Sequence, residues 1–267
     1  MSGVRIKAIS LNHNTSLFTQ LMARSLYQRN PGISIDLTIS DNSSTDTEDL
    51  ASLRSYAAEA SIPFVPSGFG LEGNVHGVVL QRFVADNPFC SHYLFLDPDV
   101  YFLQGGQIGA MIRELDAAED AWCVMPRCTW DGTNDHTPYP TEQPGLSLNY
   151  ELTWPWGGTS DRLTVRGTLK ERVHPFCVLA KNTEVFRSVA REVGLSGGCT
   201  FSLDDCCGWD TLGLATSVMK THGMRVLISD VMVFHFYNVS YDTEWIDSKR
   251  ERCRQFLAEL RAEAQGE

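Results

Sequence analysis

The stretch YLFLDPDVYF, residues 93–102, decides the fold of this chain. Apolar and aromatic residues lead into two aspartates, Asp97 and Asp99, which a single proline separates. Because residues i and i+2 of an extended chain point to the same side, both carboxylates can project together beyond the end of a strand. Pro98 disfavours helix at Asp97 and removes one donor from the strand ladder. The stretch therefore predicts a buried strand that ends at two carboxylates.

Two interpretations of this pair of aspartates are open at this point. Two like charges this close repel each other unless a cation or a proton lies between them. Carboxylate oxygens suit a hard divalent cation such as Mg²⁺ or Mn²⁺, and open α/β sheets bind ligands at the carboxyl ends of their strands. The alternative is a plain exit from strand to turn, because Asp and Pro are common turn formers.

The residues before this stretch alternate between strand and helix patterns. Strands are predicted at 4–12, 33–42 and 62–68, and helices from Thr15 or Ser16 onward, at 44–60 and at 71–86. This alternation predicts a parallel sheet with helices on both faces. Residues 127–173, rich in Pro, Gly, Thr and Trp, are interpreted as a long loop. Regular patterns resume at 175–193, 209–222 and 226–236, and an amphipathic helix follows at 243–264.

Charge and hydropathy exclude several classes of partner. The net charge of -11 makes nucleic acid and anionic membranes unexpected partners. No run approaches the roughly 20 apolar residues of a transmembrane segment, and the N-terminal residues read as a strand rather than a secretion signal. We therefore expect a cytoplasmic protein whose 8 cysteines are free thiols.

Two further segments place polar residues near predicted strand ends. In ISDNSSTD, residues 39–46, Asp41 ends a strand beside a helix N-terminus, where a carboxylate can accept from a base N–H or a ribose hydroxyl. A helix cap with a turn is the alternative for this segment. The four glycines of SGFGLEGNVHG, residues 67–77, allow close approach of a ligand to the backbone, without the spacing of a phosphate-binding loop.

Taken in order, the segments SLNHN, DNSSTD, GFGLEGN and LFLDPDV resemble those of GT-A-fold glycosyltransferases, most closely the family 2 type. The resemblance covers roughly the first hundred residues. It implies one Rossmann-like α/β domain over residues 1–267 with a mostly parallel central sheet. The implied parts are a nucleotide-sugar-binding half at 1–103, an acceptor-binding half at 104–241 that includes the loop 127–173, and a C-terminal helix at 242–267.

The resemblance also implies an activity and a set of residues. The activity is transfer of a sugar from a nucleoside-diphosphate sugar to an acceptor hydroxyl, with Mn²⁺ or Mg²⁺ and with inversion. The implied nucleotide contacts are Asn12, Asp41, Asn42, Gly70, Asn74 and Asp97, and the implied metal ligands are Asp97, Asp99 and His235. For His235, which lies in an apolar strand pattern, a hydrogen-bonded structural role is the alternative.

The second half of the chain is expected to supply a general base and an acceptor site. Asp210 follows a tryptophan and opens an apolar-periodic helix, so we expect it to deprotonate the acceptor hydroxyl. Asp204 and Asp205 are alternatives, because this segment lacks the Glu-Asp pair that such enzymes usually carry. Asp210 can also be a helix cap. Trp130, Trp154 and Trp156 can stack on an acceptor sugar or form a small cluster under the loop.

Three other functions are weighed against this interpretation. A haloacid-dehalogenase-like phosphatase also uses a D-x-D after an apolar strand, with the first Asp as nucleophile, but there the motif usually lies on the first strand. A nucleotidyltransferase normally shows a glycine-rich basic signature near its N-terminus, which VRIKAISLNHN lacks. A non-catalytic nucleotide- or sugar-binding module of the same fold stays open.

Overall fold

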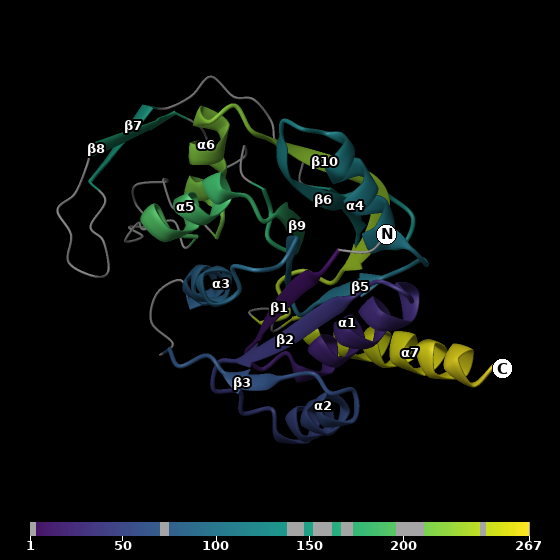
Figure 1. Ribbon diagram of the computed structural model, residues 1–267. Coiled ribbons are helices and arrows are strands. Elements are labelled where there is room, and N and C mark those ends of the chain that lie inside the picture. The colour runs from purple at the N-terminus through teal and green to yellow at the C-terminus, as the bar shows by residue number, and fades with distance from the viewer. Residues whose placement is uncertain are drawn as a thin grey trace.

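The computed structural model describes residues 4–69, 75–137, 147–151, 162–166, 173–195, 211–240 and 244–266. Its centre is one eight-stranded sheet (Figure 1). The strands of this sheet are β1 (Ile6–Asn12), β2 (Ile35–Asp41), β3 (Phe64–Pro66), β4 (His92–Leu96), β5 (Val100–Phe102), β6 (Ala121–Thr129), β9 (Cys177–Lys181) and β10 (Arg225–His235). Their order is β3-β2-β1-β4-β9-β6-β10-β5. Most neighbours are parallel, while β9 and β5 run antiparallel to theirs.

The strand order places the switch point of the sheet between β1 and β4. The described helices are α1 (Ser16–Arg29), α2 (Thr47–Glu59), α3 (Val75–Asp86), α4 (Gln107–Ala117), α5 (Glu184–Glu192), α6 (Gly213–Thr221) and α7 (Ile246–Gln265). The chain steps from β1 to β2 to β3 in one direction and then crosses back to β4. Because such crossovers are right-handed, α1 and α2 lie on one face and α3 on the other. Ligands of open α/β sheets bind where the direction reverses.

Strand β4 is the buried centre of the fold, as its run of apolar residues predicts. All five of its residues are buried, between β1 on one side and β9 on the other. The ring of Tyr93 lies 6.5 Å from Phe83 of α3 and 5.9 Å from Phe186 of α5. Phe95 lies on the same face of β4, 6.4 Å from Phe186. These rings fix α3 and α5 against one face of β4.

The chain leaves the sheet at Asp97 and Pro98 and re-enters it elsewhere. Strand β4 ends at Leu96, and Val100 begins β5, which pairs antiparallel with β10 at the opposite margin of the sheet. The prediction that pairing stops at Pro98 is confirmed. In this register Val100 lies opposite His235, so the end of β10 returns to the turn that carries both aspartates.

The predicted strands and helices are found, with two differences. The segment 127–173 is not wholly a loop, because β6 runs to Thr129 and because β7 (Ser147–Glu151) and β8 (Arg162–Arg166) form an antiparallel pair. Strand β6 is buried almost throughout, so it shows neither the alternation nor the periodicity that marks a half-buried element. The helix predicted from 243 begins at Ile246, and Trp245, which precedes it, is 60% exposed.

The C-terminal helix closes the fold beside α1 (Figure 1). Its buried residues Cys253, Phe256, Leu257 and Leu260 pack with Leu17, Phe18 and Leu21 of α1. No described helix has the length and apolar character required to cross a membrane. The five described cysteines are free thiols, as expected.

Candidate active site

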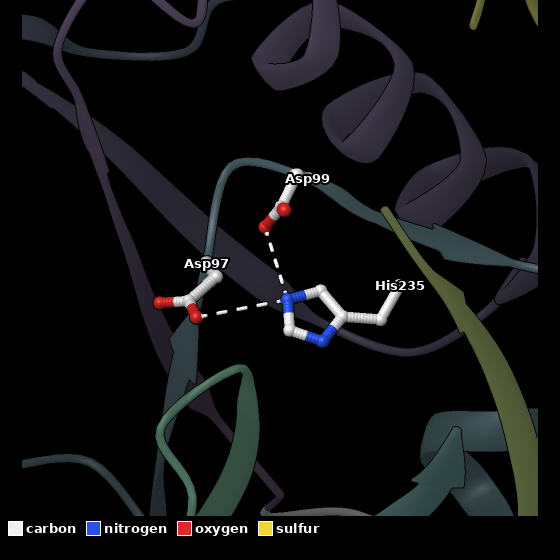
Figure 2. Close-up of side chains that lie close together, drawn as sticks. All are labelled: Asp97, Asp99 and His235. Carbon is white, nitrogen blue, oxygen red and sulfur yellow. Dashed lines mark ion pairs between the residues drawn. The ribbon is translucent and has the colours of Figure 1, made fainter. Parts of the chain in front are cut away.

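Two carboxylates and one imidazole meet at the carboxyl end of β4. Figure 2 shows the side chains of Asp97 and Asp99 directed at the same nitrogen of His235. His235 Nε2 lies 3.2 Å from Asp99 Oδ1 and 4.0 Å from Asp97 Oδ2. One ligand atom from each residue lies within 4.8 Å of the others. The structure thus brings together the three residues that the resemblance implied as metal ligands.

Backbone hydrogen bonds fix the turn that carries the aspartates. The Asp97 N–H donates to Phe176 O at 2.8 Å, and the Phe236 N–H donates to Asp99 O at 3.1 Å. Asp99 is 5% exposed, whereas the side chain of Asp97 is 25% exposed. Asp99 and His235 therefore form a rigid buried pair, and Asp97 is the carboxylate that faces solvent.

Aromatic rings and a strained backbone hold the imidazole of His235. The Phe176 ring stacks on it at 5.0 Å, and the Tyr237 ring lies 4.0 Å away. Tyr237 and Asn238 have φ values of 58° and 50°, which are uncommon for residues other than glycine. Lys249 at the start of α7 donates from Nζ to Tyr237 O at 2.7 Å. Strain of this kind is kept where the surroundings over-determine the backbone, which is common at functional sites.

The charge of the two aspartates keeps a proton on His235. Burial alone lowers the pKa of an imidazole, because it disfavours the charged form. That effect is outweighed here by the charge and hydrogen bond of Asp99 and by the charge of Asp97, which raise the pKa of His235 to about 10. The positive imidazolium compensates the buried negative charge of the pair. A divalent cation would take the place of this proton, since carboxylate oxygens and a neutral imidazole nitrogen are ligands of Mn²⁺ and related ions.

His76 is a site residue that the sequence analysis missed. It lies in the first turn of α3, and its Nε2 is 3.8 Å from Asp97 Oδ1. Asp97 therefore lies between two imidazoles, His76 on one oxygen and His235 on the other. The available signal was a histidine within the glycine-rich segment 67–77, in the first turns of the helix predicted at 71–86.

The carboxyl ends of β1 and β2 carry a second polar cluster. Asn12 Nδ2 donates to Asp41 Oδ1 at 2.8 Å and to Ser44 Oγ at 2.9 Å. Asn12 Oδ1 accepts from the hydroxyls of Thr15 and Thr19. Asn12 is 0% exposed, so its amide is used entirely inside the protein. Through the first of these bonds Asn12 positions Asp41, and its contact with a nucleotide stays a prediction.

The ISDNSSTD turn also connects the first two helices, although not in the way the cap pattern predicts. Asp46 precedes α2 and makes no cap bond to it. Its carboxylate instead accepts from the Ser16 backbone N–H at 2.9 Å and from the Ser16 hydroxyl at 3.0 Å, at the start of α1. Thr15, the residue before α1, bonds Asn12 rather than capping its own helix. Asn42 O lies 2.7 Å from His13 Nδ1, and Asn42 Oδ1 accepts from Ser67.

Sheet geometry relates the two clusters. Asn12 pairs with Asp41 across β1 and β2, and Ser10 pairs with Leu96 across β1 and β4. Neighbouring strands lie about 4.8 Å apart, so the ends of β2 and β4 are separated by about 10 Å. Asp41 and the Asp97–Asp99–His235 group therefore flank the switch point on one edge of the sheet.

Other predicted site residues are placed as follows. Trp130 directly follows β6 and is 51% exposed. Gly70, Asn74, Trp154, Trp156, Asp204, Asp205 and Asp210 lie outside the described residues.

Comparison with known proteins identifies the fold. No family model and no curated protein matches the sequence. The structure is similar to that of the mannosyltransferase PcManGT from Pyrobaculum calidifontis in complex with GDP-Man and Mn²⁺, with a TM-score of 0.56 and 13% sequence identity. That match covers 100% of this chain and 66% of PcManGT, so this chain spans about two thirds of its length. The structure of S. aureus TarS 1-349 in complex with UDP matches with a TM-score of 0.50 and 13% identity, over 96% of this chain and 70% of TarS 1-349.

These matches and the topology define the fold of the chain. The chain has a GT-A glycosyltransferase fold: a single α/β domain with a mostly parallel eight-stranded sheet. The fold prediction from the four N-terminal segments is confirmed. The Asp97–Asp99–His235 group lies where such α/β sheets bind their ligands.

Proposed function

We propose that this chain is a metal-dependent glycosyltransferase that moves a sugar from a nucleoside-diphosphate sugar to an acceptor hydroxyl with inversion. The observation that carries the proposal is the Asp97–Asp99–His235 group at the switch point of a GT-A fold. PcManGT and TarS 1-349, which share the fold, were solved with GDP-Man and with UDP respectively. These bound nucleotides support a nucleotide-linked sugar donor for this chain. A cytoplasmic location stays a prediction.

Asp97, Asp99 and His235 are the proposed ligands of Mn²⁺ or Mg²⁺. Their donor set fits such an ion, and PcManGT was solved with Mn²⁺. With an ion bound there, these residues would hold a positive charge that neutralises the diphosphate and stabilises the charge on the departing nucleoside diphosphate. The protein contributes a preformed site, because the backbone bonds of the turn and the rings around His235 hold the ligand atoms close together.

Asp41 is the proposed contact to the nucleobase or ribose. One of its oxygens accepts from Asn12 and the other from the Ser44 N–H at 3.3 Å. A carboxylate has about four acceptor positions, so Asp41 retains capacity for a base N–H or a ribose hydroxyl. Asn42 and Asp97, together with Gly70 and Asn74, complete the proposed nucleotide site.

Asp210 is the proposed general base. In the reaction it accepts the proton of the acceptor hydroxyl while the hydroxyl oxygen attacks the anomeric carbon. Asp204 and Asp205 are the alternatives for this role.

Asp210→Asn is expected to lower the rate of transfer about a hundredfold and to leave donor binding unchanged, since general-base catalysis contributes at least about that much. The measurement is kcat for nucleoside diphosphate release together with the donor Kd in the presence of Mn²⁺. Asp204→Asn and Asp205→Asn are the matched controls, and each is expected to retain most of the activity. Full activity of the Asp210 variant, with loss in one of the others, would move the base to that residue.

The proposed function is tested by incubating the protein with UDP-, GDP- and dTDP-sugars, Mn²⁺ and a panel of sugar and polyol acceptors. Release of nucleoside diphosphate that requires both metal and acceptor supports glycosyl transfer. Metal-dependent nucleotide binding with no release on any acceptor would instead indicate a binding module. Release of phosphate from a phosphomonoester in the absence of a donor would indicate a phosphatase.

A further inference from the structure

A chain of aromatic rings connects the proposed metal site to the protein surface. From His235 the nearest ring is Tyr237, at 4.0 Å, and the Trp130 ring follows at 5.3 Å from Tyr237 with an interplanar angle of 79°. Trp130 is 51% exposed, so this chain of rings ends at solvent. A half-exposed indole thus lies two ring contacts from the Asp97–Asp99–His235 group.

The indole of Trp130 is held in one orientation by a second ring. The His136 imidazole lies parallel to it, with 3.5 Å between ring centroids and an interplanar angle of 4°. Tyr237 connects to this pair a second time, through its hydroxyl, which donates to His136 O at 3.4 Å. One face of the indole is therefore covered by His136, the Tyr237 ring lies nearly perpendicular to it, and about half of the residue stays exposed.

The loop that carries the two rings is rigid because Asp131 bonds it from within. Asp131 Oδ1 accepts from the backbone N–H groups of Thr133 and Asn134, both at 2.8 Å, and from the Thr129 hydroxyl at 3.0 Å. Asp131 Oδ2 lies 3.0 Å from His136 Nε2. These hydrogen bonds, first of all those from Asn134, hold the pKa of Asp131 well below its usual range. The ring pair is therefore pre-organised, which lowers the entropic cost of binding a ligand on it.

Sheet order places Trp130 on the side of the metal site that is opposite to the nucleotide side. Strand β6, which Trp130 follows, is four strand positions from β2, which carries Asp41. At about 4.8 Å per position, the strands lie up to about 19 Å apart. Strand β4, with Asp97 at its end, lies between them. A displacement with inversion needs the acceptor on the side of the anomeric carbon opposite the leaving group, and Trp130 lies across β4 from Asp41, the proposed nucleotide contact.

We propose that the exposed face of Trp130 is an acceptor subsite that binds a pyranose ring, so that the acceptor is a saccharide. This inference rests on the proposed function for its role in transfer. An aromatic face packs against the apolar C–H face of a pyranose, whereas glycerol-like polyols present no such face. In the transfer step the acceptor oxygen bonds the anomeric carbon as the bond to the diphosphate oxygen breaks. The hydroxyl proton passes to the general base, and the bonding electron pair leaves with the nucleoside diphosphate.

Fluorine NMR of the full chain labelled with 5-fluorotryptophan tests the subsite directly. The chain has 6 tryptophans, and Trp130→Phe assigns the resonance of Trp130. Titration with the methyl pyranosides of glucose, galactose and mannose is expected to shift this resonance, and titration with glycerol is not. Trp122, which is 0% exposed, provides an internal resonance that stays fixed. Absence of a shift with every pyranoside up to about 50 mM, or an equal shift with glycerol, overturns the inference.

Steady-state kinetics provide a second test of the subsite at Trp130. Trp130→Ala is expected to raise the acceptor KM at least about fivefold, with the donor KM within about twofold, and Trp130→Phe is expected to recover most of the loss. Phe89→Ala is the matched control: Phe89 is 91% exposed but lies before the amino end of β4, at the other edge of the sheet. An unchanged acceptor KM in Trp130→Ala contradicts the subsite.

The two proposals fail in distinguishable ways. A shift of the Trp130 resonance by pyranosides, in a protein that binds no nucleoside diphosphate with Mn²⁺, supports the sugar site and contradicts the proposed transferase. Transfer without any pyranoside shift at Trp130 supports the transferase and overturns the subsite.

Discussion

Asp99→Asn is expected to abolish metal-dependent binding of nucleoside diphosphates and to lower transfer at least about 10³-fold, which corresponds to about 4 kcal/mol. Asp99 is the buried member of the carboxylate pair, and its Oδ1 lies 3.2 Å from His235 Nε2. Asparagine has nearly the same shape but no negative charge. The variant therefore removes an anionic ligand while the turn keeps its backbone hydrogen bonds. Loss of the metal would raise the activation barrier by several kcal/mol, because a metal ion stabilises charge in the transition state by about that much.

The control for this prediction is a second aspartate–histidine pair, which joins Asp116 of α4 to His92 of β4. Asp116 Oδ1 lies 3.2 Å from His92 Nε2, at the amino end of β4 rather than its carboxyl end. Asp116→Asn is expected to bind nucleotide with Mn²⁺ as the unaltered chain does. The measurement is the Kd of a nucleoside diphosphate by calorimetry, with and without Mn²⁺. Unchanged affinity in Asp99→Asn would remove Asp99 from the metal site.

Asn12→Ala is expected to reduce the free energy of unfolding by about 3 kcal/mol. The buried amide of Asn12 donates to Asp41 and Ser44 and accepts from Thr15 and Thr19. Its loss leaves several buried groups without partners, one of them a carboxylate, and each such group costs about 1–3 kcal/mol. Some of the hydroxyls can rotate to new partners, so the expected loss is smaller than the sum.

The measurement is the midpoint of urea unfolding, with the slope used to check that the transition itself is unchanged. Asn87→Ala is the matched control, since Asn87 Nδ2 makes a hydrogen bond of 2.9 Å to Phe83 O and is only partly buried. Its expected cost is about 1 kcal/mol. A loss in Asn12→Ala no larger than in Asn87→Ala contradicts the view that Asn12 organises the ends of β1 and β2.

The elements of this fold were predictable because they depend on local patterns. The apolar run before Asp97 predicts a buried strand, and Pro98 predicts where its pairing ends; both are confirmed. The alternation of strands and helices over the first hundred residues predicts the parallel part of the sheet, β3-β2-β1-β4. Strand β6 was missed because an element buried on both sides lacks a periodic pattern.

The site was predictable only in part, because its assembly depends on strand order. The sequence places Asp97 and Asp99 at one strand end, but nothing local shows that β5 pairs with β10 and so brings His235 to that end. The resemblance, rather than the periodicity, pointed to His235. The internal role of Asn12 could not be predicted for a related reason: its burial arises from α1 and the turn after β2, which close over it in the folded protein.

The central claim is that Asp97, Asp99 and His235 bind a divalent cation together with a nucleoside diphosphate. Thermal unfolding in the presence of UDP, GDP or dTDP, with and without Mn²⁺, tests it most directly. At a concentration about 100 times its Kd, a ligand stabilises the native state by about 2.7 kcal/mol, which raises the Tm by several degrees in a chain of this size. We expect this rise with at least one nucleotide, only when Mn²⁺ is present, and not in Asp99→Asn. An equal rise without Mn²⁺, or no rise with any of the three nucleotides in its presence, would contradict the account.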